Sequence, residues 1–153
     1  MNYKIKIFSF LLILNSILAF SQNLEEKRSR EEIESNVAIE KAEKFYNEKK
    51  YKKAIDFYSD AVSYGKNLPD IYKKRAGTFF QIGDYENAIK DFTKVIELNP
   101  ENSSKIYFMR GLSKTLLTTE DKEGACQDIK KAIDLGYDVS NLNGLDEYCS
   151  FKK

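Results

Sequence analysis

The chain has 153 residues, of which 25 are basic and 24 are acidic, and it contains no histidine. This near-neutral balance argues against nucleic acid or an anionic membrane surface as the main partner, because both are bound by an excess of lysine and arginine. The absence of histidine removes the commonest general base and metal ligand, and with it any Ser-His or Cys-His nucleophile. We therefore expect a protein that is not an enzyme and that needs no metal or cofactor.

The N-terminal segment, residues 1–21, differs sharply in composition from the rest. Two lysines precede an apolar run over residues 7–20, which is shorter than the roughly 20 residues that a membrane-spanning helix needs. Small side chains at Ala19 and Ser21 mark a site for signal peptidase. We predict a signal peptide over 1–21, cleaved after Ser21, and therefore an exported protein, periplasmic or secreted, that is not inserted in the membrane after cleavage. The alternative is an uncleaved N-terminal anchor.

The next segment, residues 22–34, is strongly polar and reads QNLEEKRSREEIE. It has too few apolar side chains to pack, so we expect either disorder or a solvated extension of the first helix. Regular helical structure is expected from about residue 31 to about residue 135. Residues 1–21 carry only two basic side chains and no acidic one, so the chain without them stays near neutral. Its length suits a single domain.

The central part of the chain contains an internal repeat with a spacing of about 34 residues. Aromatic residues, small residues, a Gly-Asp turn and a final proline recur at fixed positions. In the clearest copy these positions are Tyr72, Ala76, Phe79, Gly83, Tyr85, Ala88, Phe92, Val95 and Pro100. In the preceding copy the equivalent residues are Ala42, Phe45, Tyr51, Ala54, Tyr58 and Ala61. A match of residue types at a constant offset is the signature of a repeat architecture.

This pattern closely resembles the tetratricopeptide repeat (TPR) family, in which each repeat is a hairpin of two antiparallel helices. The resemblance implies an all-α fold: a solenoid of three helical hairpins with a short C-terminal capping helix. Within residues 35–138 the repeats are expected at about 35–68, 69–102 and 104–138, and the cap at 139–153. The third copy lacks the Gly-Asp turn, because Lys-Thr-Leu-Leu-Thr-Thr-Glu-Asp stands at that place.

Small residues at matching places in each hairpin indicate where its two helices approach most closely. The expected pairs are Ala42 with Ala54, Ala76 with Ala88, and Gly111 with Ala125. Aromatic side chains fill the space beside such contacts.

Arginine and aspartate also recur at equivalent positions. Arg75 and Arg110 precede the small residues of their first helices, and Asp91 and Asp128 lie in the second helices. We interpret them as ion pairs that fix each hairpin, with partial burial deciding their importance. The alternative is that the two arginines bind an anion.

The only cysteines are Cys126 and Cys149. Export places them in an oxidising compartment, where such a pair can persist as a disulfide. If the terminal helix folds back on the last hairpin, the bond closes a loop worth about 3 kcal/mol. Exported TPR proteins with a similar Gly-Ala-Cys-x-Asp segment and a terminal cysteine imply this pairing, and two unpaired thiols are the alternative.

The TPR resemblance places a partner-binding groove on the concave side, along the first helices. The resemblance assigns these residues to the concave side: Glu43, Tyr46, Asn47, Lys73, Phe80, Gln81, Lys105, Phe108, Met109 and Leu112, with Ile39 and Gly77 beside them. Apolar members are typical of an anchor pocket and the lysines can receive acidic groups. Alternatively, the C-terminal segment fills part of the groove, or the aromatic residues belong to the core.

Some TPR domains clamp the terminal carboxylate of a partner with lysine, asparagine and arginine. Here Ile39 and Glu43 occupy first-repeat positions where that clamp has lysine and asparagine. We therefore do not expect a clamp of this kind.

These features predict a non-catalytic module that binds a peptide or helix of a partner protein in the concave groove. The alternative function is a structural subunit of a cell-envelope assembly, which contacts its partners, or copies of itself, through its end or convex faces. A hydrolase or thiol oxidoreductase is the weakest hypothesis, because the two cysteines lack Cys-x-x-Cys spacing.

Overall fold

The computed structural model describes residues 3–65, 68–99, 103–117, 121–140 and 144–149. Within these ranges the chain forms seven α-helices and no β-strand. They are α1 (Tyr3–Asn47), α2 (Tyr51–Ser63), α3 (Leu68–Gln81), α4 (Tyr85–Leu98), α5 (Ser104–Leu116), α6 (Lys122–Asp134) and α7 (Leu145–Cys149). The predicted all-α class is confirmed.

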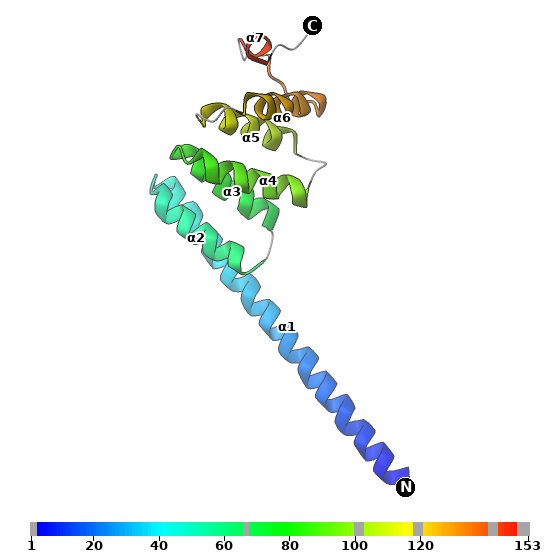
Figure 1. Cartoon of the computed structure of the whole chain (residues 1–153). Helices are drawn as coiled ribbons and strands as arrows, with labels where there is room; N and C mark the ends of the chain where they lie inside the picture. Colours follow the sequence, from blue (N-terminus) through cyan, green and yellow to red (C-terminus); the bar gives the residue numbers. More distant parts are fainter. Residues whose placement is uncertain (1–2, 66–67, 100–102, 118–120, 141–143, 150–153) are drawn as a thin grey trace.

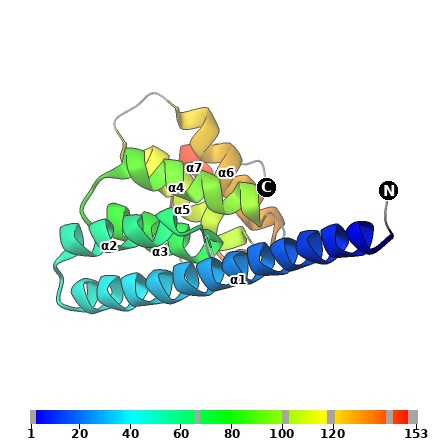
Figure 2. The same ribbon diagram turned by 90° about the horizontal axis from the view of Figure 1, so that it is seen from below.

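Six of these helices form three hairpins, α1 with α2, α3 with α4 and α5 with α6, which stack in chain order (Figure 1). The stack is continuous because α2 packs against α3 and α4 packs against α5. Each hairpin therefore depends on its neighbours to cover its apolar face, as expected for a solenoid. Figure 2 shows α1 running along one side of the stack and projecting well beyond it.

The first helix begins far earlier than the sequence pattern predicts. Helical structure is expected from about residue 31, but α1 is one continuous helix of 45 residues. Its polar stretch contains good helix formers and two ion pairs between successive turns, Arg30 with Glu26 and Lys27 with Glu31. The sequence allows either disorder or a helical extension for residues 22–34, and the structure has the helical extension. No helix in the described part of the chain has both the length and the apolar character needed to cross a bilayer.

Local turn chemistry sets the boundaries inside the second and third hairpins. Gly83 has a φ of 77° after the end of α3, and the Asp84 side chain then accepts a hydrogen bond from the backbone N–H of Asn87. The third hairpin lacks the Gly-Asp turn, yet the Asp121 side chain accepts a bond of 2.9 Å from the N–H of Gly124. An aspartate cap therefore begins α4 and α6 alike.

Small residues lie at the close approach of the two helices in each hairpin. Ala42 and Ala54 are fully buried in one core cluster, and Ala76 and Ala88 in the next. In the third hairpin a methyl group added to Gly111 would lie 2.9 Å from the carbonyl oxygen of Ala125. At this point the backbones of α5 and α6 are too close for any side chain.

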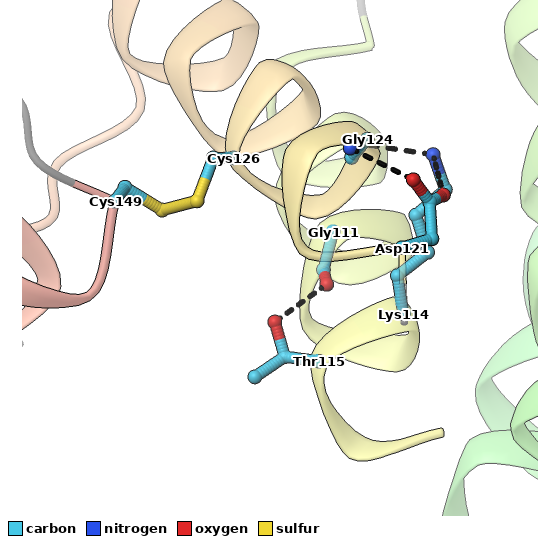
Figure 3. The surroundings of a disulfide bond; sticks show 7 residues. All are labelled: Gly111, Lys114, Thr115, Asp121, Gly124, Cys126 and Cys149. Atoms are coloured by element: carbon cyan, nitrogen blue, oxygen red, sulfur yellow. Dashed lines mark hydrogen bonds and ion pairs between the residues drawn. A yellow bond between two sulfur atoms is a disulfide. The ribbon is translucent and has the colours of Figure 1, made fainter. Parts of the chain in front are cut away.

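The third hairpin is covered at its far side by the C-terminal segment. Phe108 on α5 stacks on Tyr137 with 4.6 Å between ring centroids, and Val139 and Leu145 pack against the same cluster. A disulfide between Cys126 and Cys149 joins α6 to α7 (Figure 3). The segment therefore takes the place that a fourth hairpin would occupy. Positions 141–143 and 150–153 of the expected cap lie outside the described residues.

Both arginine and aspartate pairs are formed, and each extends to a second hairpin. Arg75 on α3 donates two hydrogen bonds, of 2.7 and 2.9 Å, to the carboxylate of Asp91 on α4. Its remaining terminal nitrogen donates a bond of 3.0 Å to Ser59 on α2. The bonds to Asp91 raise the pKa of Arg75 above its ordinary value despite burial. One guanidinium thus ties together three consecutive helices.

The same arrangement recurs one repeat later. Arg110 donates bonds of 2.9 and 2.6 Å to Asp128 and a bond of 3.1 Å to Thr93 of the preceding hairpin. The ammonium group of Lys114 lies 3.0 Å from the same Asp128 carboxylate. In this copy the aspartate is therefore paired with two basic side chains.

We predict that Asp91→Ala lowers the free energy of unfolding by about 3 kcal/mol, because it leaves a largely covered arginine without its partner. Only 7% of the Asp91 side chain is exposed. The control is Asp134→Ala, whose pair with Lys130 is solvent-exposed and is worth at most about 1 kcal/mol. Urea unfolding of both variants measures the difference. Equal stability of the two variants would contradict a structural role for the pair.

We also predict that Gly111→Ala destabilises the protein by about 2 kcal/mol, because the methyl group must displace backbone and side-chain atoms of α6. Alanine is otherwise the better helix former. A rise in the melting temperature of this variant would show that α5 and α6 do not approach as closely as described.

Candidate functional site

A cavity of about 440 Å³ opens between the three hairpins. Helices α1 to α5 all contribute to it, and most of its lining comes from the first helix of each hairpin. The lining residues are Glu43, Tyr46, Tyr58, Lys73, Lys74, Gly77, Phe92, Lys105, Ile106 and Met109. Its volume lies within the range of about 300–1,000 Å³ that is typical of ligand sites.

The floor of this cavity is apolar and belongs to the core of the stack. Tyr58, Phe92 and Ile106 are each at least nine-tenths buried. Burial raises the pKa of Tyr58 to about 12, and the nearby Glu43 carboxylate adds to the effect. Because Tyr58 stays protonated at neutral pH, the floor carries no charge. Tyr46 and Met109 form half-buried walls above it.

The rim of the cavity is mainly basic. Lys74 pairs with Glu43 across the gap between α3 and α1, and Lys73 pairs with Asp70 on its own helix. Lys105 is exposed and forms no ion pair among the residues that the structure describes. The lining thus holds three lysines and one glutamate, although the whole chain has a net charge of only +1. A ligand that brings acidic groups is favoured at this rim.

Gly77 leaves part of the cavity wall without a side chain. It lies inside α3, where glycine costs about 1 kcal/mol relative to alanine. A methyl group added at Gly77 would meet nothing within 4 Å, in contrast to Gly111. Neither packing nor a positive φ requires glycine at this position.

The structure brings together half of the residues that the sequence places in the groove. Glu43, Tyr46, Lys73, Lys105 and Met109 all line the cavity.

The other five residues lie elsewhere. Asn47 and Gln81 are exposed at the ends of α1 and α3. Phe80 packs edge-on against Tyr85, with 5.4 Å between ring centroids, and does not line the cavity.

Phe108 and Leu112 do not line the cavity. For Phe108 the structure has the alternative that the sequence left open, in which the aromatic residues belong to the core. Phe108 is only 8% exposed, and both residues pack in the core cluster beneath the C-terminal segment. The physical reason is that this segment covers the face of α5 that a following hairpin would cover. Among the described residues, the C-terminal segment contributes none to the cavity lining.

Sequence reasoning missed the residues that form the cavity floor. Tyr58 and Phe92 come from second helices, and Ile106 packs in the core cluster of the preceding hairpin. In the repeat pattern, an aromatic or apolar side chain at these positions indicates burial. The pattern does not show that one side of each side chain also lines a cavity. Within the described ranges, no group of three or more His, Cys, Asp or Glu side chains is placed to hold a metal ion.

Comparison with known proteins agrees with the repeat pattern. Residues 69–102 match the family model described as tetratricopeptide repeat. The chain is 31% identical over 101 residues to Hsp70-Hsp90 organizing protein 3 of Arabidopsis thaliana, covering 64% of this chain and 18% of that protein. It is 32% identical over 117 residues to RNA polymerase II-associated protein 3 of Xenopus tropicalis, covering 74% and 17%. The chain therefore spans less than a fifth of the length of these relatives.

Solved structures of TPR domains share the fold. The second TPR domain of human RPAP3, in complex with the HSP70 peptide SGPTIEEVD, has a TM-score of 0.66 and 26% identity, covering 80% of this chain and 99% of that one. The Sgt2 TPR domain from Aspergillus fumigatus has a TM-score of 0.62 and 26% identity, covering 75% and 76%. These likenesses confirm a solenoid of helical hairpins.

Proposed function

Because this chain belongs to the tetratricopeptide repeat family, we propose that it is a non-catalytic protein-interaction module. It binds an extended peptide or a helix of a partner protein in the cavity between α1, α3 and α5. The observation that carries this proposal is an open cavity with a buried apolar floor and a basic rim. Such a site can hold an apolar anchor residue and orient the groups around it. The RPAP3 domain, which is bound to a peptide, supports this mode of recognition.

We predict that a photoreactive phenylalanine analogue at Tyr46 crosslinks a protein partner in the native envelope. The control carries the same group at Lys90, which is exposed on α4 and does not line the cavity. Mass spectrometry of the adducts identifies the partner and the crosslinked peptide. An adduct at position 46 that is absent at position 90 supports the proposal, and adducts only at position 90 contradict it.

One observation favours the alternative of a structural subunit. Ile33 and Val37 are exposed on α1 and, with Phe57 of α2, border a second hollow of about 300 Å³ at the end of the stack. The lining also includes Glu34, Lys41 and Asp60, and an end face with exposed apolar side chains among charged ones can receive another protein or a second copy of the chain. In the crosslinking experiment this function predicts adducts at Val37 in place of Tyr46.

We further propose that residues 1–21 are a cleaved signal peptide and that the mature protein is exported. Every described side chain from Phe10 to Arg30 is exposed, so residues 10–21 add no packing to the hairpins. The disulfide between Cys126 and Cys149 suits an oxidising compartment.

We predict that the protein recovered from the cell envelope begins at Gln22. Ser21→Leu blocks the cleavage because signal peptidase requires a small residue there, whereas Ser16→Leu, inside the apolar run, leaves it unchanged. N-terminal sequencing and intact mass measure both effects. An exported wild-type protein that keeps residues 1–21 would contradict cleavage, and a protein found only in the cytoplasm would contradict export.

A further inference from the structure

Two glycines inside helices of the stack have opposite structural roles. Gly111 is required because α6 leaves no room for a methyl group. Gly77 faces open space within the cavity, and alanine at that position would favour the helix without meeting any atom. The fold alone therefore gives no reason for glycine at 77. A ligand that approaches the backbone of α3 closely does give one.

The charges at the rim are distributed unevenly across the cavity. On the α1 side, the carboxylate of Glu43 is paired with Lys74. On the α5 side, Lys105 is exposed and has no ion pair among the described residues. An incoming carboxylate therefore meets a neutralised ion pair at one wall and, among the described residues, an unpaired cation at the other. This asymmetry orients a bound peptide, with its acidic residue toward α5.

Resting on the function proposed above, we propose that the cavity binds an internal acidic segment of a partner protein. An apolar side chain of this segment enters over Gly77 and packs on Tyr58 and Phe92. A neighbouring aspartate or glutamate pairs with Lys105. The segment needs no free C-terminus, because Glu43 already pairs with Lys74 and leaves that lysine without a free charge for an additional carboxylate.

The chemistry of the cavity selects this occupant over other classes. The buried floor is uncharged and apolar, so a charged side chain would lose its hydration there without gaining a partner. At the rim Lys73 and Lys74 are already paired with carboxylates, and the charge that remains, on Lys105, disfavours a basic peptide. An acidic segment with one apolar anchor satisfies both conditions.

A selection experiment with defined peptides tests the proposal. Short random peptides are displayed on phage with their C-terminus fused to the coat protein, so none has a free terminal carboxylate. They are selected on the full-length folded protein with its disulfide intact. The proposal expects enriched peptides in which an apolar residue lies within a few positions of aspartate or glutamate. Enrichment of basic peptides, or of no sequence, would overturn it.

The best peptide is then synthesised with both ends blocked, and its dissociation constant is measured by fluorescence anisotropy. Lys105→Glu is expected to weaken binding about tenfold, because it converts an attraction into a repulsion. Lys90→Glu changes the net charge equally but lies on α4 outside the cavity, so it leaves affinity unchanged. Equal effects of the two variants would overturn the acidic preference.

Gly77→Ala gives the second readout, since it acts on stability and binding in opposite directions. We expect the melting temperature to rise by about 3 °C from helix propensity, while peptide affinity falls severalfold. Gly77→Leu should abolish binding in a folded protein, as judged by circular dichroism. A more stable Gly77→Ala variant with unchanged affinity would overturn the contact. A less stable Gly77→Ala variant would reveal a structural need for glycine and overturn it as well.

Tyr46→Ala separates failure of this inference from failure of the proposed function. If the peptide loses affinity for Tyr46→Ala but not for Lys105→Glu or Gly77→Ala, the cavity is the binding site and only the inference about its ligand fails. If none of these three variants affects binding, the cavity is not the site and both proposals fail.

Discussion

The stacking of the hairpins depends on one repeated interaction, a partly buried arginine that joins three consecutive helices. Arg75 pairs with Asp91 of its own hairpin and donates a hydrogen bond to Ser59 of the preceding one. A guanidinium presents its donors in a fixed plane, so three such bonds determine the relative position of the helices that carry the acceptors. Apolar packing alone is less directional. The second copy, centred on Arg110, repeats the same constraint one hairpin later.

This constraint also sets the shape of the cavity. The two arginines fix α3 against α2 and α5 against α4, and the cavity is lined by the five helices α1 to α5. Its walls therefore come from elements held by buried, paired side chains, and little ordering of these walls is required when a ligand binds. Two features of the lining bear on the ligand. Gly77 presents no side chain, and Lys105 has no ion pair within the part of the chain that the structure describes.

Sequence reasoning identified the repeats because the same residue types recur at a constant offset, as Ala42 and Ala76 do. It placed the Arg75 and Arg110 pairs for the same reason. It failed where the environment of a residue depends on the next element of the stack. Phe108 has the residue type and register of a groove residue, yet the C-terminal segment covers it. The sequence left the helical extension over residues 22–34 as one of two alternatives, because a solvated helix has no apolar periodicity.

The central claim is that the cavity between α1, α3 and α5 is the surface that binds a partner. Methyl-labelled NMR spectra, recorded with and without a bound peptide, test this claim directly. The resonances of Ile106 and Met109, which line the cavity, are expected to shift on binding. Those of Ile33 on α1 and Ile133 on α6, which are exposed outside it, should stay in place. Shifts at Ile33 or Ile133, with Ile106 and Met109 unmoved, would contradict the account.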